Sequence, residues 1–126
     1  MFATTLQVAL GGAIGAAARF LTGVAVLRAF GRDGFPLGII TVNVLGSFLM
    51  GALVVWLGQR ALTHLNPFLL TGILGGFTTF SAFSLETVTL FERGQVGQAA
   101  LYVVLTVTLS IGALLAGLML MRSVLA

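Results

Sequence analysis

Gly75-Gly76-Phe77-Thr78-Thr79-Phe80-Ser81-Ala82-Phe83-Ser84 lies inside a hydrophobic segment that is long enough to cross a membrane. The two adjacent glycines lower helix propensity by about 1 kcal/mol each relative to alanine, and hydroxyl and phenylalanine side chains follow them directly. In hydrocarbon every backbone polar group needs an internal partner, so a helix break at that depth is tolerated only where protein or a watery cavity covers it. The stretch therefore predicts a broken transmembrane helix and a functional site.

The composition of the whole chain excludes a soluble fold. Hydrophobic residues make up 59% of the 126 residues and charged residues 7%, against about 25% charged in soluble domains. We expect residues 1–126 to form a single transmembrane domain, because a chain of this length is one domain at most. The absence of cysteine excludes thiolate nucleophiles and thiolate metal sites. The arginines are scattered, so nothing supports nucleic-acid binding.

Charge-free runs predict an all-α membrane protein with a break in the third of four helices. Each run is near or above the roughly 20 residues that cross a bilayer core, and the helices are expected at about 3–27, 36–58, 67–91 and 96–122. Pro67 suits the first turn of the third helix, and we expect Asn66 to cap that helix. The N-terminus lacks the basic region of a secretory signal, so the first helix is expected to be retained.

The arginines outside the spans are almost balanced between the two sides of the membrane. Arg60 and Arg122 fall on the side of the N-terminus, whereas Arg28, Arg32 and Arg93 fall on the other. Orientation normally follows an excess of Lys and Arg on the cytoplasmic side. Such a small bias is explained either by a weak preference that is settled during insertion or by insertion in both orientations with antiparallel pairing.

Small residues spaced four apart predict tight helix packing, because this spacing lets helix backbones approach closely in lipid. Such stripes occur in the first three helices: Gly11, Gly15, Arg19 and Gly23; Asn43, Ser47 and Gly51; and Gly72 and Gly76. Four short helices offer little interior for a pore or a substrate cavity. A homo-oligomer is therefore the expected state.

Three polar side chains in the spans each allow a structural and a functional interpretation. Arg19 could snorkel to the interface or form an electropositive mouth, and we expect it near one end, facing a vestibule. Glu86 could be a proton-coupled carboxylate, but pairing with a cation such as Arg19 is the favoured interpretation. Asn43 could make an interhelical hydrogen bond or point an uncharged donor at an anion.

Two further patterns suggest an anion path. Tyr102, Thr106 and Ser110 recur every four residues and share one face of the fourth helix, although Ser and Thr hydroxyls in such helices commonly bond their own backbone. Phe80 and Phe83 are three residues apart and nearly stacked, which ordinary packing also explains. Aromatic ring edges are electropositive, so they can coordinate an anion without binding it too tightly to leave.

The segment from Gly75 to Glu86 resembles the signature of the small bacterial fluoride channels (Fluc, also called CrcB). Gly38-Ile39-Ile40-Thr41-Val42-Asn43-Val44-Leu45-Gly46 and Gly11-Gly12-Ala13-Ile14-Gly15-Ala16-Ala17-Ala18-Arg19-Phe20 resemble the second-helix and first-helix segments of that family. The resemblance spans nearly the whole chain in order. It implies an antiparallel, dual-topology homodimer of four-helix subunits with two fluoride pores, in agreement with the balanced arginines.

The resemblance also implies roles for individual residues. It assigns Arg19 to the aqueous vestibule and six residues to the fluoride pore: Asn43, Phe80, Phe83, Ser84, Tyr102 and Ser110. Gly75 and Thr78 stand where family members hold a structural sodium ion at the dimer interface through backbone carbonyls, and a broken helix does expose such carbonyls. Ala82 and Ile39 stand where family members often have hydroxyl residues.

The resulting expectation is a passive, fluoride-selective channel in the inner cell membrane that exports cytoplasmic fluoride and lowers its toxicity. Two other function classes are weighed against it. A small proton-coupled multidrug exporter would need a deep titratable acid, for which Glu86 is the candidate. A purely structural membrane subunit would not need a glycine-weakened segment followed by clustered hydroxyls. An enzyme is not expected, because no nucleophile–base pair is present and His64 lies in a loop.

Overall fold

The computed structural model describes residues 1–31 and 35–126, so Arg32 of the arginine count lies outside the described residues. The described chain has four helical segments long and apolar enough to cross a membrane, which confirms the predicted number. The third is divided into shorter pieces. The elements are α1 (Phe2–Phe30), α2 (Leu37–Gln59), the 3-10 turn η1 (Thr63–Leu65), the π-helical η2 (Pro67–Leu74), α3 (Gly75–Phe77), α4 (Phe80–Glu92) and α5 (Val96–Leu125).

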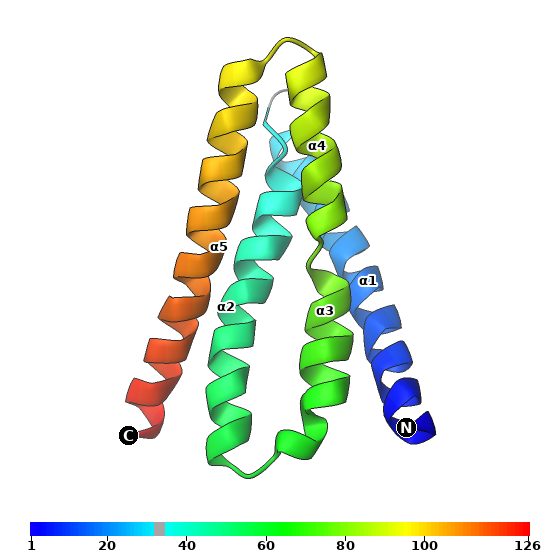
Figure 1. Ribbon diagram of the computed structural model, residues 1–126, viewed down its shortest axis with the longest axis vertical. Coiled ribbons are helices and arrows are strands. Elements are labelled where there is room, and N and C mark those ends of the chain that lie inside the picture. The colour runs from blue at the N-terminus through cyan, green and yellow to red at the C-terminus, as the bar shows by residue number, and fades with distance from the viewer. Residues whose placement is uncertain (32–34) are drawn as a thin grey trace.

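Both termini and the α2–η1 connection lie at one end of the molecule, and the α4–α5 connection lies at the other (Figure 1). Arg28 in the last turn of α1 and Arg93 at the end of α4 belong to the second end. Arg60 after α2 and Arg122 in the last turn of α5 belong to the first. The described arginines outside the spans are thus divided evenly between the two ends.

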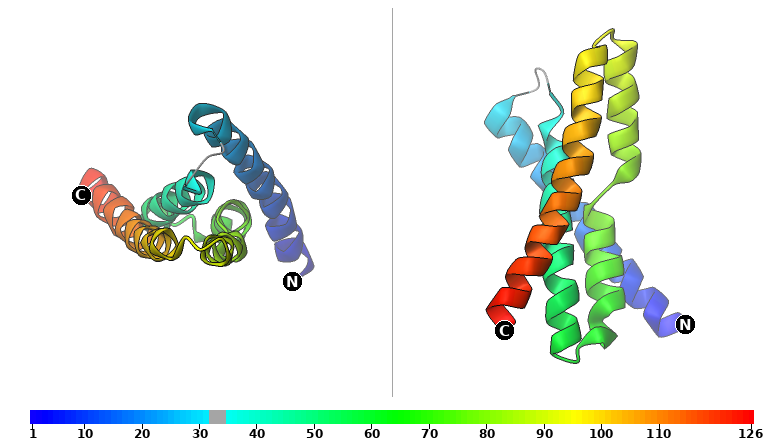
Figure 2. Two further views of the ribbon diagram at one scale, coloured as in Figure 1. Left: turned by 90° about the horizontal axis from the view of Figure 1, so that it is seen from above. Right: turned by 60° about the vertical axis from the view of Figure 1, so that its left-hand side comes forward.

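The break in the third span changes the helix against which that span packs. Its first half, η2 and α3, packs along α1, whereas its second half, α4, packs against α5. α5 also runs along α2, and α1 leans away from α4 (Figure 2). Between the described parts of α1 and α4 there is no direct packing. The break therefore opens a space on the α1 side of α4.

Glycines make the close approach between α1 and the third span possible. A Cβ atom on Gly11 would lie 2.9 Å from the Cα of Gly72, and one on Gly76 would lie 2.7 Å from the carbonyl oxygen of Gly12. Gly15 is buried against the backbone of Ile73 in the same way. The packing predicted for these positions is confirmed. Gly23 does not extend it, because a Cβ atom there would have no neighbour from the described chain within 4 Å.

The start of the third span differs from the expectation. Pro67 is in the first turn as predicted, but Asn66 makes no side-chain capping bond, so the predicted cap is wrong. Asn66 has helical backbone angles rather than the extended ones of a capping residue. The 3-10 turn before it carries the chain directly into the π-helical η2, which leaves no extended residue at the junction.

Candidate functional site

The third span is broken immediately after the glycines rather than at them. Gly75 and Gly76 are helical, whereas Thr78 (φ −87°, ψ 159°) and Thr79 (φ −152°, ψ 123°) are extended. The prediction of a break is confirmed, but its assignment to the glycines is wrong. Gly76 is required for contact with α1, since a Cβ there would meet Gly12. The glycine pair thus permits packing, and other groups hold the break open.

Asn43 of α2 binds the backbone on both sides of one break residue. Its Oδ1 atom accepts a hydrogen bond of 2.9 Å from the Thr79 N–H, and its Nδ2 atom donates one of 3.0 Å to the Thr79 carbonyl. The side chain thus pairs with an extended residue as a neighbouring strand would. The interhelical hydrogen bond considered for Asn43 is therefore present. A carboxamide has two N–H hydrogens, so one remains for another acceptor.

The break diverts the N–H groups that backbone carbonyls would use in a continuous helix, where the carbonyl of residue i accepts from the N–H of residue i+4. The natural donor for Gly75 is the Thr79 N–H, which instead binds Asn43. The natural donor for Thr78 is the Ala82 N–H, which instead binds the Thr79 hydroxyl at 3.1 Å.

The carbonyls of Gly75 and Thr78 therefore lack their helical partners. Unwound carbonyls and the carboxyl ends of half-helices are the groups that hold sodium ions in membrane proteins. The carbonyl oxygens at the break are hard ligands that fit such an ion. The Gly76 carbonyl is differently placed, because the Nε atom of Arg19 donates a hydrogen bond of 3.2 Å to it.

A groove of about 420 Å³ begins at the break and runs between α2, the start of α4 and α5. Phe80 is 76% exposed and Phe83 is 6% exposed, and their ring centroids lie 5.4 Å apart in an edge-on arrangement. The polar and aromatic lining residues are Asn43, Ser47, Thr78, Thr79, Phe80, Phe83, Thr106 and Ser110. Four of the predicted pore residues thus line one groove: Asn43, Phe80, Phe83 and Ser110.

Two hydroxyls on α5 are buried without a partner, unlike several other hydroxyls of the described helices. Thr41, Thr87 and Thr108 each donate to the carbonyl four residues earlier, as such side chains commonly do in membrane helices. The Oγ1 atom of Thr106 and the Oγ atom of Ser110 are buried without a partner in the described chain. Buried polar groups normally have hydrogen-bond partners, so these two hydroxyls are available to something in the groove.

Tyr102 and Ser84 lie outside the residues that line this groove. Tyr102 is fully buried, and its ring lies between Phe83 and Phe35 at centroid distances of 5.3 and 5.5 Å. Its hydroxyl donates a hydrogen bond of 2.9 Å to Glu86. The Ser84 hydroxyl donates to the Phe80 carbonyl at 3.0 Å, within its own helix.

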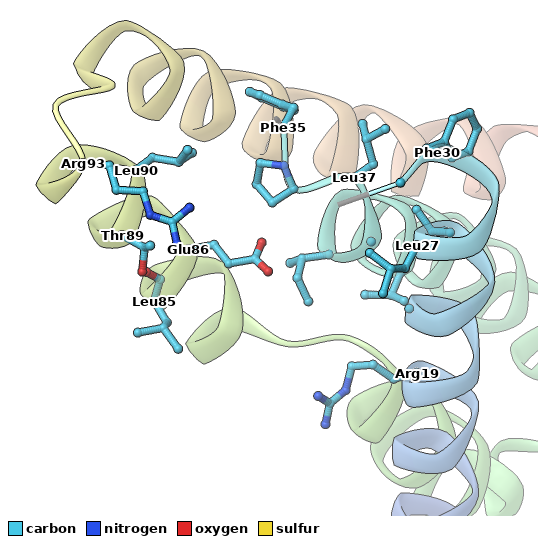
Figure 3. Close-up of a pocket in the computed structure, with 17 residues that line it drawn as sticks. Arg19, Leu27, Phe30, Phe35, Leu37, Leu85, Glu86, Thr89, Leu90 and Arg93 are labelled. Carbon is cyan, nitrogen blue, oxygen red and sulfur yellow. The ribbon is translucent and has the colours of Figure 1, made fainter. Parts of the chain in front are cut away.

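A second, wider cavity of about 530 Å³ lies between α1, α2 and α4. Figure 3 shows Glu86 pointing into it from α4, with Arg19 of α1 at the end beside the break. Arg93 also lines the cavity. The expected pairing of Glu86 with Arg19 is wrong: Glu86 is bound by Tyr102, and Arg19 is bound to the Gly76 carbonyl. Arg19 thus lines the cavity and also contacts the backbone just before the break.

Thr79 is the residue of this site that reasoning from the sequence missed. Its hydroxyl caps α4 and its backbone is held by Asn43. A sequence signal did exist, because threonine is a preferred capping residue and Thr79 stands directly before a helical stretch. The neighbouring glycines are a stronger sequence signal for a break, so the sequence predicts the break at the glycines rather than at Thr79.

The fold and the site define a multi-pass helical membrane protein with a broken span, in which a groove starts at the break. Residues 6–118 match the sequence model of the family described as CrcB-like protein, Camphor Resistance (CrcB). The chain belongs to this family, which confirms the resemblance.

Curated relatives carry the name "Fluoride-specific ion channel FluC". The protein from a Ruegeria species is 65% identical over 125 residues, which cover 99% of both chains. That from Roseobacter denitrificans is 62% identical over 120 residues, covering 94% of this chain and 95% of its own. That from Caulobacter vibrioides is 49% identical over 124 residues, covering 96% and 97%. The relatives are ion channels, in agreement with the expectation that the chain is not an enzyme.

Proposed function

We propose that this protein is a passive fluoride channel whose anion path follows the groove between α2, the start of α4 and α5. The observation that carries the proposal is that two buried α5 hydroxyls without partners in the described chain share a groove with an edge-on phenylalanine pair. The names of the relatives supply the identity of the anion. Fluoride is small and strongly hydrated, so it needs replacement contacts wherever the groove excludes water.

The start of α4 adds a favourable electrostatic term. The N-terminus of a helix carries a partial positive charge and unpaired N–H groups, which suit an anion. Phe80 and Phe83 stand in the first turns of α4, and their ring edges present weak positive charge. Such contacts stabilise an anion without holding it, as a conducting path requires. The remaining N–H of Asn43 completes this half of the path.

The other assigned residues extend the path at its ends. Arg19 faces the wide cavity between α1, α2 and α4, which we assign as the aqueous vestibule where anions concentrate. Ser110 belongs to the α5 side of the groove. Tyr102 packs against Phe83, and Ser84 bonds the Phe80 carbonyl; we assign both residues to the pore wall rather than to direct contact in the groove.

We further propose that the working unit is an antiparallel homodimer with a structural sodium ion at its interface. Gly75 is exposed in the single chain, yet its carbonyl lacks a helical donor at a depth where lipid offers none. A second copy would cover it. Hard cations take about six or more oxygen ligands, so the Gly75 and Thr78 carbonyls of one chain are too few. The near balance of arginines in the sequence, with Arg60 and Arg122 on one side and Arg28, Arg32 and Arg93 on the other, supports insertion in both orientations.

Export from the cytoplasm through the inner membrane follows from the chemistry of the anion. Hydrogen fluoride is neutral, crosses lipid and ionises inside the cell, where the anion is then trapped. A negative-inside potential drives an anion outward by about 2.3 kcal/mol per charge per 100 mV. A passive path is therefore sufficient to lower cytoplasmic fluoride and its toxicity.

Fluoride efflux from liposomes that contain the purified protein tests the proposal. A potassium gradient with valinomycin sets the potential, and a fluoride electrode follows release. We expect fast efflux that depends on the potential, is absent for chloride and is unchanged by an imposed pH gradient. Efflux that requires a proton gradient and is abolished by Glu86→Gln would instead identify a proton-coupled exporter and refute the channel.

A further inference from the structure

We propose that Asn43 and Thr79 are positioning residues that keep the Gly75 and Thr78 carbonyls free of helical partners, so that the break can hold a sodium ion. The inference rests on the sodium site of the proposed function and adds how this chain builds that site. It assigns Asn43 a role toward the cation in addition to its role in the anion path. Thr79 acquires a role that the pattern of the sequence did not indicate.

The geometry at Asn43 supplies the first half of the argument. In a continuous helix the Thr79 N–H would bind the Gly75 carbonyl. Asn43 Oδ1 takes this N–H at 2.9 Å, and Asn43 Nδ2 holds the carbonyl of the same residue at 3.0 Å. Thr79 thereby stays extended, because any return to helical angles would break both bonds. The amide thus keeps the competing donor away from the Gly75 carbonyl.

Thr79 supplies the second half through its side chain. Its hydroxyl accepts the Ala82 N–H at 3.1 Å, and this N–H is the donor that the Thr78 carbonyl would use in a continuous helix. The same hydroxyl lies 3.3 Å from the Ser81 hydroxyl, which also helps to orient it. Asn43 therefore binds the Thr79 N–H, and the Thr79 hydroxyl binds the Ala82 N–H, so neither N–H is available to its helical carbonyl.

The two diversions free two carbonyls, one on exposed Gly75 and one on half-buried Thr78. Gly75 is exposed, and a Cβ atom there would have ordinary contact with one atom, the Leu70 carbonyl oxygen at 3.6 Å. The Gly76 carbonyl between them is occupied by Arg19 at 3.2 Å. Gly75 is thus open to a second copy, whereas Thr78, like Asn43, lines the groove.

Two pairs of variants separate this role from effects on the anion. Asn43→Asp keeps an oxygen acceptor for the Thr79 N–H but brings negative charge to the groove, whereas Asn43→Leu removes the acceptor at similar size. Thr79→Ser keeps the capping hydroxyl, whereas Thr79→Val replaces it with a methyl group. Sodium binding to purified full-length protein is measured by titrating sodium chloride into a buffer of N-methylglucamine chloride and following the thermal unfolding midpoint. Fluoride efflux is measured in parallel.

We expect Asn43→Leu and Thr79→Val to bind sodium about three- to tenfold more weakly, which is the worth of one restored backbone hydrogen bond. Asn43→Asp keeps one of the two bonds to Thr79, so it should bind sodium more tightly than Asn43→Leu while it loses fluoride efflux, and Thr79→Ser should retain both. If Asn43→Leu fails to fold, the Thr79 pair tests the inference alone.

Unaltered sodium affinity in Thr79→Val, or equal loss in Asn43→Asp and Asn43→Leu, would overturn the inference. A fluoride-conducting protein without any sodium-dependent shift would also overturn it and leave the channel standing. If the variants show the expected sodium affinities but the unaltered protein does not conduct fluoride, the inference is supported and the proposed function is refuted.

Discussion

Gly15→Ala is the substitution that most directly tests how α1 holds the broken span. The added Cβ atom would lie 2.9 Å from both the carbonyl carbon of Ile73 and the backbone nitrogen of Phe77. The carbonyl oxygen of Ile73 would lie nearer still. Non-bonded atoms prefer about 3.5 Å or more, so α1 has to retreat by more than roughly 0.6 Å. The opposing atoms belong to the backbone and cannot turn away. Overpacking of this kind costs about 1–3 kcal/mol.

Gly23→Ala in the same helix is the matched control. Nothing in the described part of the chain lies within 4 Å of a Cβ atom at Gly23. Both substitutions gain the same helix propensity, about 1 kcal/mol, so this term cancels when the two variants are compared. Gly15→Ala should therefore be less stable than Gly23→Ala by about 1–3 kcal/mol in reversible unfolding in mixed micelles. Equal stability of the two variants would refute the packing argument.

Gly15→Ala should also weaken the site, because Arg19 follows Gly15 by one helical turn. The Arg19 Nε atom lies 3.2 Å from the Gly76 carbonyl. A retreat of more than roughly 0.6 Å would lengthen this contact beyond the range of a hydrogen bond. We expect slower fluoride efflux in Gly15→Ala than in Gly23→Ala. Efflux that is unchanged despite a lower stability would show that Arg19 does not need this contact.

Substitutions at three further positions test the anion path and the Tyr102–Glu86 bond. Phe80→Ile keeps apolar bulk but removes the ring edge, so fluoride efflux should fall while the dimer persists in gel filtration; unchanged efflux would remove Phe80 from the pore. Tyr102→Phe should cost about 0.6–3 kcal/mol of stability through the lost bond to Glu86. The same substitution in a Glu86→Gln background should cost less, and stability effects that simply add in this double-mutant cycle would contradict the pairing. Arg19→Lys should leave more efflux than Arg19→Gln, because it keeps the charge although it loses the Nε donor; equal efflux in both would argue against a role for charge at the vestibule.

The four spans and the small-residue contacts were predictable from the sequence because both follow from local composition. A charge-free run of sufficient length crosses a membrane wherever its partners lie, and a glycine spacing of four places small residues on one face. Gly11 and Gly15 pack against the third span as the pattern predicts, but Gly23 continues the pattern without reaching that span, and a Cβ atom on Gly23 would find no neighbour within 4 Å in the described chain. Spacing defines a face of the helix, and only the tilt of α1 decides where along that face the contact ends.

The position of the break could not be predicted from local composition, because it depends on a side chain 36 residues away. Gly75 and Gly76 are two adjacent weak helix formers, yet they stay helical. Thr78 and Thr79 leave the helix since Asn43 replaces the bonds that unwinding loses. The predicted pairing of Glu86 with Arg19 was wrong for a related reason. α4, after the break, packs against α5 and brings Glu86 to Tyr102, whereas α3, before the break, packs against α1 and brings the Gly76 carbonyl to Arg19.

A single break can serve ions of both signs because the two half-helices meet at it with opposite ends. α3 ends there with carbonyls that carry partial negative charge, and α4 begins there with N–H groups that carry partial positive charge. The carbonyls of Gly75 and Thr78 lie on the α3 side, and Phe80 and Phe83 lie on the α4 side. Asn43 binds the residue between these sides. A substitution at Asn43 should therefore weaken sodium binding and fluoride conduction together, unless it keeps the acceptor for the Thr79 N–H, as Asn43→Asp does.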